Sequence, residues 1–230
     1  TSPADGIPQG DNFDIDYVAH EMGHQFGGNH TQNNNCNRAL AVETGSGVTI
    51  MGYAGICAPD VAAHSIDNFH SSNLIEITNF LASANAGCRT LVSVPNNSPV
   101  ISSSTGNHTI PKSTPFALTC TASDADGDVM TYNWDQFDNQ VSTQSPLSTN
   151  TGGPNFRCFS STLSPTWYFP TISSISTNTN DPWQVLPSVA RTMNFRLTVR
   201  DNHSGNGCTA SATSTITFDG TAGPFVVSSP

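Results

Sequence analysis

One segment constrains this chain more than any other feature of its sequence. It runs from His20 to His30 and reads H-E-x-x-H-x-x-G-x-x-H, with Glu21 after the first histidine and His24 as the second. Two histidines four residues apart lie on the same face of an α-helix, where two imidazoles can bind one metal ion. Gly27-Gly28 permits the helix to end and the chain to turn, because glycine adopts positive φ at little steric cost. The segment therefore predicts a Zn²⁺ site made by His20, His24 and His30.

The same segment supplies a carboxylate for hydrolysis. Three neutral imidazoles leave one tetrahedral position of zinc open for water, which is the arrangement of a catalytic site. Bound zinc lowers the pKa of water from 15.7 to about 7 and polarises a carbonyl. Glu21 is rotated by about 100° from His20 on the helix, so its carboxylate reaches the water instead of the metal. We therefore expect Glu21 to be the general base and acid.

A methionine follows the third histidine by about twenty residues, in the segment T-I-M-G-Y that ends at Tyr53. With this Met51, residues 11–90 resemble the active-site helix and lower subdomain of the metzincin zinc peptidases, and are most similar to bacterial reprolysin-like peptidases, relatives of the adamalysins. The resemblance implies that Met51 is the Met-turn residue beneath the three ligands. It also implies that Tyr53 binds zinc or stabilises the oxyanion, as a tyrosine at this position does in astacins and serralysins. Thr31 departs from the pattern, because adamalysins usually carry Asp there.

The composition favours an extracellular protein. Only 10% of the residues are charged, the single lysine is Lys112, and the formal net charge is −10. This balance excludes nucleic-acid binding, which needs basic patches to neutralise phosphate. Apolar runs fall short of the roughly 18 to 20 residues that cross a bilayer, so no membrane span is expected. Residues 1–10 lack the features of a signal peptide, so we expect the chain to be an internal fragment of a secreted protein.

The resemblance has a consequence for substrate binding. Metzincins bind substrate along an edge strand of an upper subdomain that precedes the zinc helix, and only nineteen residues precede His20 here. We therefore expect this fragment to lack the upper subdomain and to bind zinc while cleaving poorly.

Six cysteines also indicate an extracellular protein, because paired disulfides form in oxidising compartments. Our first choice is a bridge between Cys36 and Cys57, which would close the loop between the third ligand and the Met turn. The other four are Cys88, Cys120, Cys158 and Cys208. With three cysteines in each half of the chain, either one bridge joins the two halves or some thiols stay unpaired, and a missing upstream partner for Cys88 is a third possibility.

The composition changes near Leu91, where a Pro- and Asn-containing linker precedes Thr- and Ser-rich sequence. Two helices are expected before it, at about 13–26 and 72–84, and His64 and His70 are expected to pack or cap just before the second. Alternating runs beyond it predict β-strands. The expected strands are 116–120, 130–134, 194–199 and 213–218.

These observations predict a multidomain chain. The first domain is a mainly α metzincin lower subdomain with zinc helix, Met turn and C-terminal helix, and the second is an all-β, Ig-like or cadherin-like sandwich large enough for its own core. A Ser-, Thr-, Asn- and Pro-rich insertion at about 142–189 departs from a minimal module of that type. The expected boundaries are 1–93 for the catalytic fragment, 94–98 for a linker, 99–222 for the sandwich and 223–230 for a second linker.

Three aspartates in five residues precede a predicted strand. Asp124, Asp126 and Asp128 could hold Ca²⁺, which takes six to eight oxygens, and Asp201 at the end of another strand could add a ligand. The alternative is a solvated turn, because the spacing does not continue into an EF-hand.

The sequence thus predicts a secreted zinc endopeptidase with a protein or peptide substrate. Two alternatives remain open: an adhesion or binding protein with a vestigial zinc site, and a protein in which zinc is purely structural. The sequence identifies neither the peptide specificity nor the partner of the sandwich.

Overall fold

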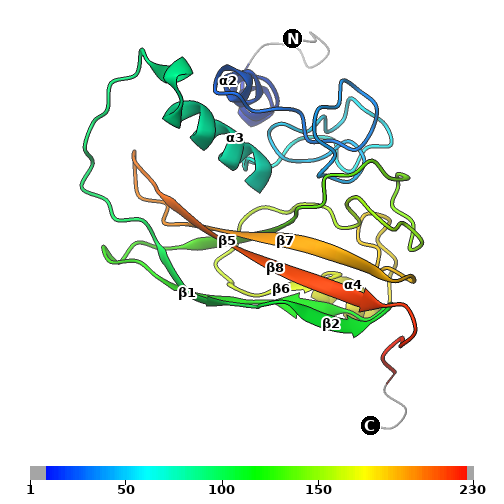
Figure 1. Cartoon of the computed structure of the whole chain (residues 1–230). Coiled ribbons are helices and arrows are strands. Elements are labelled where there is room, and N and C mark those ends of the chain that lie inside the picture. Colours follow the sequence, from blue (N-terminus) through cyan, green and yellow to red (C-terminus); the bar gives the residue numbers. More distant parts are fainter. Residues whose placement is uncertain (1–8, 227–230) are drawn as a thin grey trace.

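A helical N-terminal region lies against a region of β-strands in the computed structural model of the chain (Figure 1). The structure describes residues 9–226. The outer ends of the predicted catalytic fragment and of the predicted second linker, residues 1–8 and 227–230, lie outside the described residues. No helix of this described range is long and apolar enough to span a membrane.

One continuous helical run carries the first two histidines of the zinc motif. It consists of α1 (Asp11–Phe13), the π-helical turn η2 (Asp14–Ala19) and α2 (His20–Gln25). The helix predicted at about 13–26 is therefore confirmed to within about two residues. Single π-helical turns inside α-helices are often found at functional sites, and this one ends where the zinc motif begins.

The second helix, α3 (Ser71–Ala82), is followed by the short 3₁₀ turn η3 (Ala84–Ala86). The ring of His70 caps α3, because its Nδ1 accepts a hydrogen bond from the backbone amide of Ser72 at 3.1 Å. The expected capping role of His70 is thereby confirmed. After η3 the chain runs without helix or strand around one side of the molecule to the β region (Figure 1).

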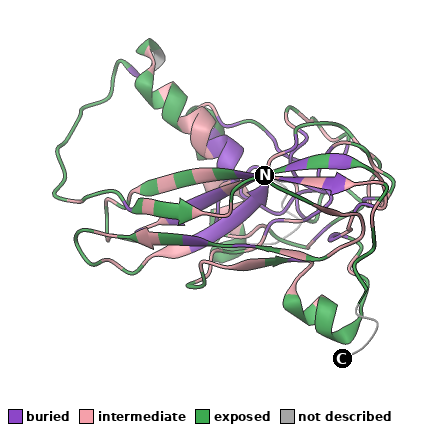
Figure 2. Ribbon diagram, turned by 60° about the horizontal axis from the view of Figure 1, so that its bottom comes forward, coloured by how far each residue is buried: buried purple, intermediate pink, exposed green. Residues whose placement is uncertain are grey.

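The β region follows from the alternation of apolar and polar side chains. Along most of the two longest strands, every second side chain is more deeply buried than its neighbours, which is the pattern of strands that cover a core on one face (Figure 2). The strands are β1 (Val100–Ser104), β2 (His108–Pro111), β3 (Phe116–Leu118), β4 (Cys120–Ser123), β5 (Thr131–Gln136), β6 (Trp167–Phe169), β7 (Arg191–Arg200) and β8 (Thr209–Asp219).

Three sheets enclose one hydrophobic core. The largest has the strand order β2-β8-β7-β5, with β2 parallel to β8 and the other pairs antiparallel, and the pairs β1-β4 and β3-β6 complete the region. Side chains from all three sheets pack together in the core, which is the arrangement expected of packed β layers. Its most deeply buried members include Leu118, Phe169, Met193, Phe195, Leu197, Val199 and Phe218.

The strand predicted at 116–120 is two strands in the structure. Strand β3 pairs with β6, whereas β4 pairs with β1, so the chain leaves one sheet and joins another between them. At this point Thr119 exchanges hydrogen bonds with Thr105: the Thr105 amide donates to the Thr119 carbonyl at 2.8 Å, and the Thr119 amide donates to the Thr105 hydroxyl at 2.8 Å. The other three predicted strands are confirmed as parts of β5, β7 and β8.

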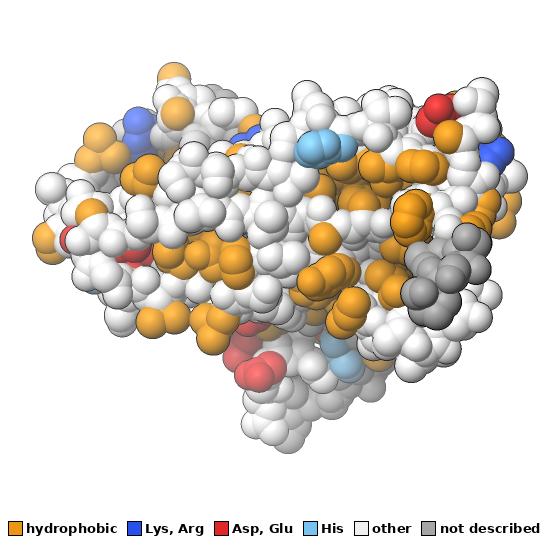
Figure 3. All heavy atoms as spheres, turned by 90° about the horizontal axis from the view of Figure 1, so that it is seen from below, with side chains coloured by type: hydrophobic (Ala, Val, Ile, Leu, Met, Phe, Trp, Pro, Cys, Tyr) orange, Lys and Arg blue, Asp and Glu red, His pale blue; other side chains and the backbone are white. Residues whose placement is uncertain are grey.

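The insertion expected at about 142–189 is mostly irregular, with β6 and the short helix α4 (Ile172–Thr177) inside it. Viewed from the β side, the surface shows scattered hydrophobic and uncharged side chains and few charged ones (Figure 3), in keeping with the low content of charged residues in the sequence.

Candidate metal centre

The predicted zinc motif lies at the end of the helical run. His20 and His24 project from α2 one turn apart, as the spacing requires. Beyond the helix the chain turns at Gly27, whose φ of 84° would strain a residue with a side chain. This turn returns His30 to the side of the helix that carries the other two imidazoles.

The three imidazoles meet at one point. Their ring centroids are 4.8 Å apart for His20 and His24, 5.2 Å for His20 and His30, and 4.6 Å for His24 and His30. One ring nitrogen of each lies within 4.8 Å of the others. Three residues that are spread over one helix and its exit turn therefore form a single cluster.

Backbone carbonyls orient all three rings. Each Nδ1 is within hydrogen-bond distance of a carbonyl oxygen, which only accepts, so each Nδ1 carries the proton and each Nε2 presents its lone pair. The Nδ1···O distances are 2.7 Å from His20 to Ile50, 2.9 Å from His24 to Gly28, and 2.8 Å from His30 to Asn37.

The donor set fits a metal ion. The Nε2 atoms of His24 and His30 are 2.9 Å apart, and both are lone-pair donors because both Nδ1 atoms donate elsewhere. Two such lone pairs repel each other unless a cation lies between them. Three neutral imidazole nitrogens are the ligand set of catalytic zinc sites, and a bound Zn²⁺ would remove this repulsion.

Burial favours the neutral form of two of these rings. Loss of solvent lowers the pKa of His20 and of His30 from the usual value, and the neighbouring His24 lowers both further. The hydrogen bonds to Ile50 and Asn37 act in the opposite direction. A neutral imidazole is the form that binds a metal, so the environment favours metal binding near neutral pH.

Met51 lies directly under the helix that carries the ligands. Its side chain is fully buried, and a Cβ built on Gly23 would lie 2.3 Å from the Met51 sulfur and 3.0 Å from the ring of Phe69. Only glycine at position 23 therefore allows this methionine to pack against α2. The position agrees with the predicted role of Met51 as a hydrophobic floor.

We expect Gly23→Ala to lower the free energy of unfolding by about 1 to 2 kcal/mol, because a Cβ 2.3 Å from the Met51 sulfur makes overpacking cost about 2 to 3 kcal/mol and the gain in helix propensity offsets about 1. Denaturant unfolding measures this change. Gly106→Ala is the matched control, since a Cβ there has no atom within 4 Å and φ is ordinary. A Gly23→Ala variant as stable as the parent would contradict this packing.

The two predicted catalytic side chains flank the cluster. Glu21 is exposed and directly follows His20 on α2, and its charge partly offsets the lowering of the pKa of His20 and His30 that burial causes. The half-buried ring of Tyr53 lies 4.5 Å from the ring of His30 and 5.7 Å from that of His20, measured between centroids. The structure thus brings together all six residues that the sequence assigned to the zinc site.

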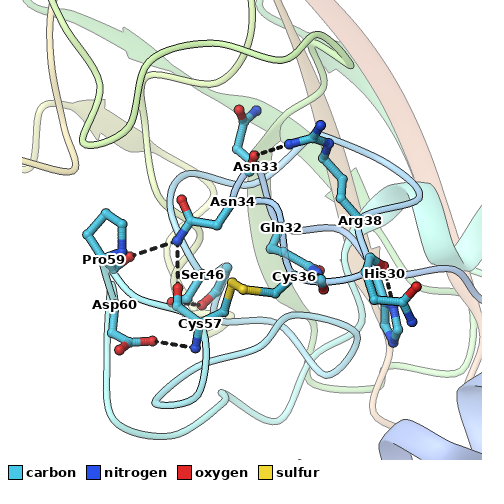
Figure 4. Close-up of a disulfide and its surroundings, with 12 residues drawn as sticks. His30, Gln32, Asn33, Asn34, Cys36, Arg38, Ser46, Cys57, Pro59 and Asp60 are labelled. Atoms are coloured by element: carbon cyan, nitrogen blue, oxygen red, sulfur yellow. Dashed lines mark hydrogen bonds between the residues drawn. A yellow bond between two sulfur atoms is a disulfide. The ribbon is translucent and has the colours of Figure 1, made fainter.

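The predicted disulfide between Cys36 and Cys57 is confirmed. It closes the loop between the third ligand and the segment after the Met turn, and Figure 4 shows it beside Asn34, whose side-chain amide donates to the Cys57 carbonyl at 2.6 Å. The remaining four cysteines are unpaired, and no bridge joins the two halves of the described chain.

The β region supports the same loop from the other side. Trp183 and Cys158 of the insertion pack against Val48 and Val61 in a small hydrophobic cluster. A Cβ on Gly45 would lie 2.6 Å from the Trp183 ring, so the two parts of the chain are in close contact. The sequence did not predict this interface, because its residues are far apart in the chain and have no local pattern.

Three of the four acidic residues predicted to bind calcium lie close together. Asp124, Asp126 and Asp128 each have a carboxylate oxygen within 4.8 Å of the others. Other groups contact this cluster. The backbone amide of Asn97 donates to Asp126 at 2.7 Å, and His203 Nδ1 is 2.8 Å from an Asp128 oxygen.

Asp201 is outside that cluster of three. Its carboxylate is buried and accepts hydrogen bonds from the backbone amides of His203 and Cys208 and from the side-chain amide of Asn96. These bonds join the predicted linker, the end of β7 and the loop before β8.

A second buried group of metal-ligand types, formed by His70, Asp135 and Cys158, has a structural explanation. Nδ1 of His70 accepts from Ser72, and its Nε2 lies 3.2 Å from the Gln136 carbonyl, so neither ring nitrogen has a free lone pair. The group links α3 to the β region.

Sequence reasoning missed the groups that orient the ligands. The carbonyls of Ile50 and Asn37 carry no signal in the sequence, because any residue supplies a carbonyl. Glu43, which accepts hydrogen bonds from Thr31, Val48 and Thr49, was also missed, because nothing in the sequence marks this glutamate as buried.

Comparison with known proteins agrees with this geometry. Residues 2–81 match the family described as metallo-peptidase family M12B, reprolysin-like. No curated protein matches the chain. The match covers the zinc motif, the Met turn and most of α3, and it supports a metallopeptidase.

Proposed function

We propose that this chain carries the zinc centre of a secreted zinc-dependent endopeptidase that acts on protein or peptide substrates. The observation that carries the proposal is the convergence of three imidazoles whose Nδ1 atoms all donate to backbone carbonyls. The reprolysin-like match over residues 2–81 supports the same conclusion. The disulfide between Cys36 and Cys57 supports an oxidising, extracellular location.

The side chains around the centre have different roles in hydrolysis. Bound zinc supplies a Lewis acid that polarises the peptide carbonyl and makes a water molecule acidic enough to react near neutral pH. His20, His24 and His30 hold the ion, and Glu21 accepts the proton of the attacking water and passes it to the leaving amine. The Tyr53 hydroxyl donates a hydrogen bond to the developing oxyanion.

One comparison separates this proposal from its two alternatives. Zinc content and peptide hydrolysis are measured for the full-length protein and for its Glu21→Gln variant. A peptidase binds zinc and loses hydrolysis in the variant. A vestigial site and a purely structural site both give no hydrolysis in either protein. The two differ in stability: for a purely structural site, removal of zinc lowers the unfolding temperature of both proteins equally.

We also propose that the β region is an accessory domain that binds Ca²⁺ at Asp124, Asp126 and Asp128, with Asp201 stabilising the adjoining loops. Three carboxylates with oxygens within 4.8 Å of one another repel, and a divalent cation relieves that repulsion. The hydrogen bond from Asn97 ties the predicted linker to the same site.

Calcium is expected to raise the unfolding temperature of the chain, because a ligand that binds only the folded state stabilises it, by about 2.7 kcal/mol at 100 times its dissociation constant. Asp126→Ala should abolish the calcium-dependent rise, and Asp219→Asn, at the opposite end of the β region, should preserve it. Thermal unfolding with calcium and with chelator measures both. If chelation leaves the parent unchanged, the acidic segment is a solvated turn.

A further inference from the structure

Glu43 is a buried carboxylate between the zinc loop and the Met turn. Its residue is 1% exposed, and four hydrogen bonds compensate it. Oε2 accepts from the backbone amides of Val48 at 2.8 Å and Thr49 at 3.0 Å. Oε1 accepts from the hydroxyls of Thr31, at 2.6 Å, and Thr49. Each carboxylate oxygen thus accepts two hydrogen bonds, so the Glu43 side chain fixes the positions of the groups that donate to it.

These partners adjoin the groups that set the ligand geometry. Thr31 directly follows the third ligand, His30. Thr49 directly precedes Ile50, whose carbonyl orients the ring of His20. The Glu43 carboxylate therefore connects two neighbours of the site: Thr49, next to the carbonyl that orients His20, and Thr31, next to the third ligand.

Backbone hydrogen bonds fix the same frame. The Thr31 carbonyl accepts from the amides of Val42 and Glu43, at 3.1 and 3.0 Å, and the Thr31 amide donates to the Met51 carbonyl at 3.2 Å. These backbone bonds bring the segments of Thr31, Glu43 and Met51 side by side, and the Glu43 side chain adds further hydrogen bonds between them.

We propose that Glu43 is a positioning residue of the metal centre, which fixes the Met turn against the segment of His30 so that the three imidazoles meet at one ion. This inference rests on the proposed zinc site. It assigns a function to the one deeply buried glutamate of the chain, which sequence reasoning left without a role.

The shape of the site distinguishes alanine from glutamine at this position. Alanine leaves four donors without an acceptor. Glutamine can accept from the two amides through its oxygen and donate to Thr31 and Thr49 through its nitrogen, because hydroxyls both donate and accept. If the role is positional, glutamine restores what alanine loses.

The test measures zinc affinity of the whole chain by competition with a chelator. Groups that orient metal ligands typically contribute 10- to 100-fold to affinity, so Glu43→Ala is expected to bind zinc at least about tenfold more weakly. Glu43→Gln should recover most of that loss. The visible absorption of the Co²⁺-loaded chain, which reports the ligand geometry, should change in the alanine variant and return in the glutamine variant.

Asp138→Asn is the matched control for loss of a buried carboxylate. Asp138 is 4% exposed and bonds to Gln136, Asn194 and Arg191 in the β region, and none of these bonds reaches Glu43 or the zinc ligands. The control should be less stable than the parent and bind zinc equally well. Equal weakening of zinc binding in Asp138→Asn would show a general effect of instability and overturn the proposal.

If Glu43→Ala does not fold, the double variant Thr31→Val/Thr49→Val decides, because it removes the two hydroxyl donors and keeps the carboxylate. Unchanged zinc affinity in that variant, or in a folded Glu43→Ala, overturns the inference alone. A parent chain that binds no zinc overturns the proposed function, and the inference with it.

Discussion

Replacement of Glu21 by glutamine is expected to leave zinc in place and, in the full-length protein, to lower peptide hydrolysis at least about 100-fold, the contribution of a positioned acid or base. Glu21 is exposed beside the three imidazoles and has no part in holding the helix, so the substitution removes proton transfer without disturbing the fold. Steady-state hydrolysis of a peptide, with zinc content determined on the same samples, measures the effect.

Asp14→Asn is the control for this experiment. Asp14 is also exposed and lies on the same helical run, so its substitution removes the same charge without touching the site. Hydrolysis by Asp14→Asn should equal that of the parent. Unchanged turnover in Glu21→Gln would refute the assigned role.

The metal centre was predictable because its information is local. The three histidines and Glu21 lie within one helix and one turn, whose geometry follows from residue spacing and from the glycines between them. Met51 and Tyr53 were identified by resemblance, and in the structure Met51 packs against Gly23 of α2 while Tyr53 lies beside the ring of His30.

The support of the centre was not predictable, because it depends on long-range contacts. The path of the loop between His30 and Met51 decides which carbonyls meet the imidazoles and that Glu43 faces inward. The packing of Trp183 from the β region on this loop is a contact between residues far apart in sequence. No periodicity or spacing carries this information.

In the β region, the success of the prediction depended on strand length. The long strands β7 and β8 alternate strictly enough to be recognised, whereas β1, β2 and β6 have three to five residues and mostly half-buried or exposed side chains. The split of β3 from β4 was missed because a change of sheet at Thr119 leaves the alternation of side chains unbroken.

His24→Ala is expected to abolish zinc binding. Of the three ligands, His24 alone is exposed, so its removal takes away one ligand while the buried His20 and His30 keep their packing and their carbonyl partners. Two imidazoles do not hold zinc against a chelator as three do, because catalytic zinc sites require three protein ligands. His108→Ala, an exposed histidine of the β region, is the control.

The most direct test of the zinc centre is the metal content of these proteins after dialysis against a weak chelator, determined by elemental analysis. We predict about one zinc per chain in the parent and in His108→Ala, and almost none in His24→Ala. Zinc in His24→Ala equal to that in the parent would contradict the assignment of the metal to His20, His24 and His30.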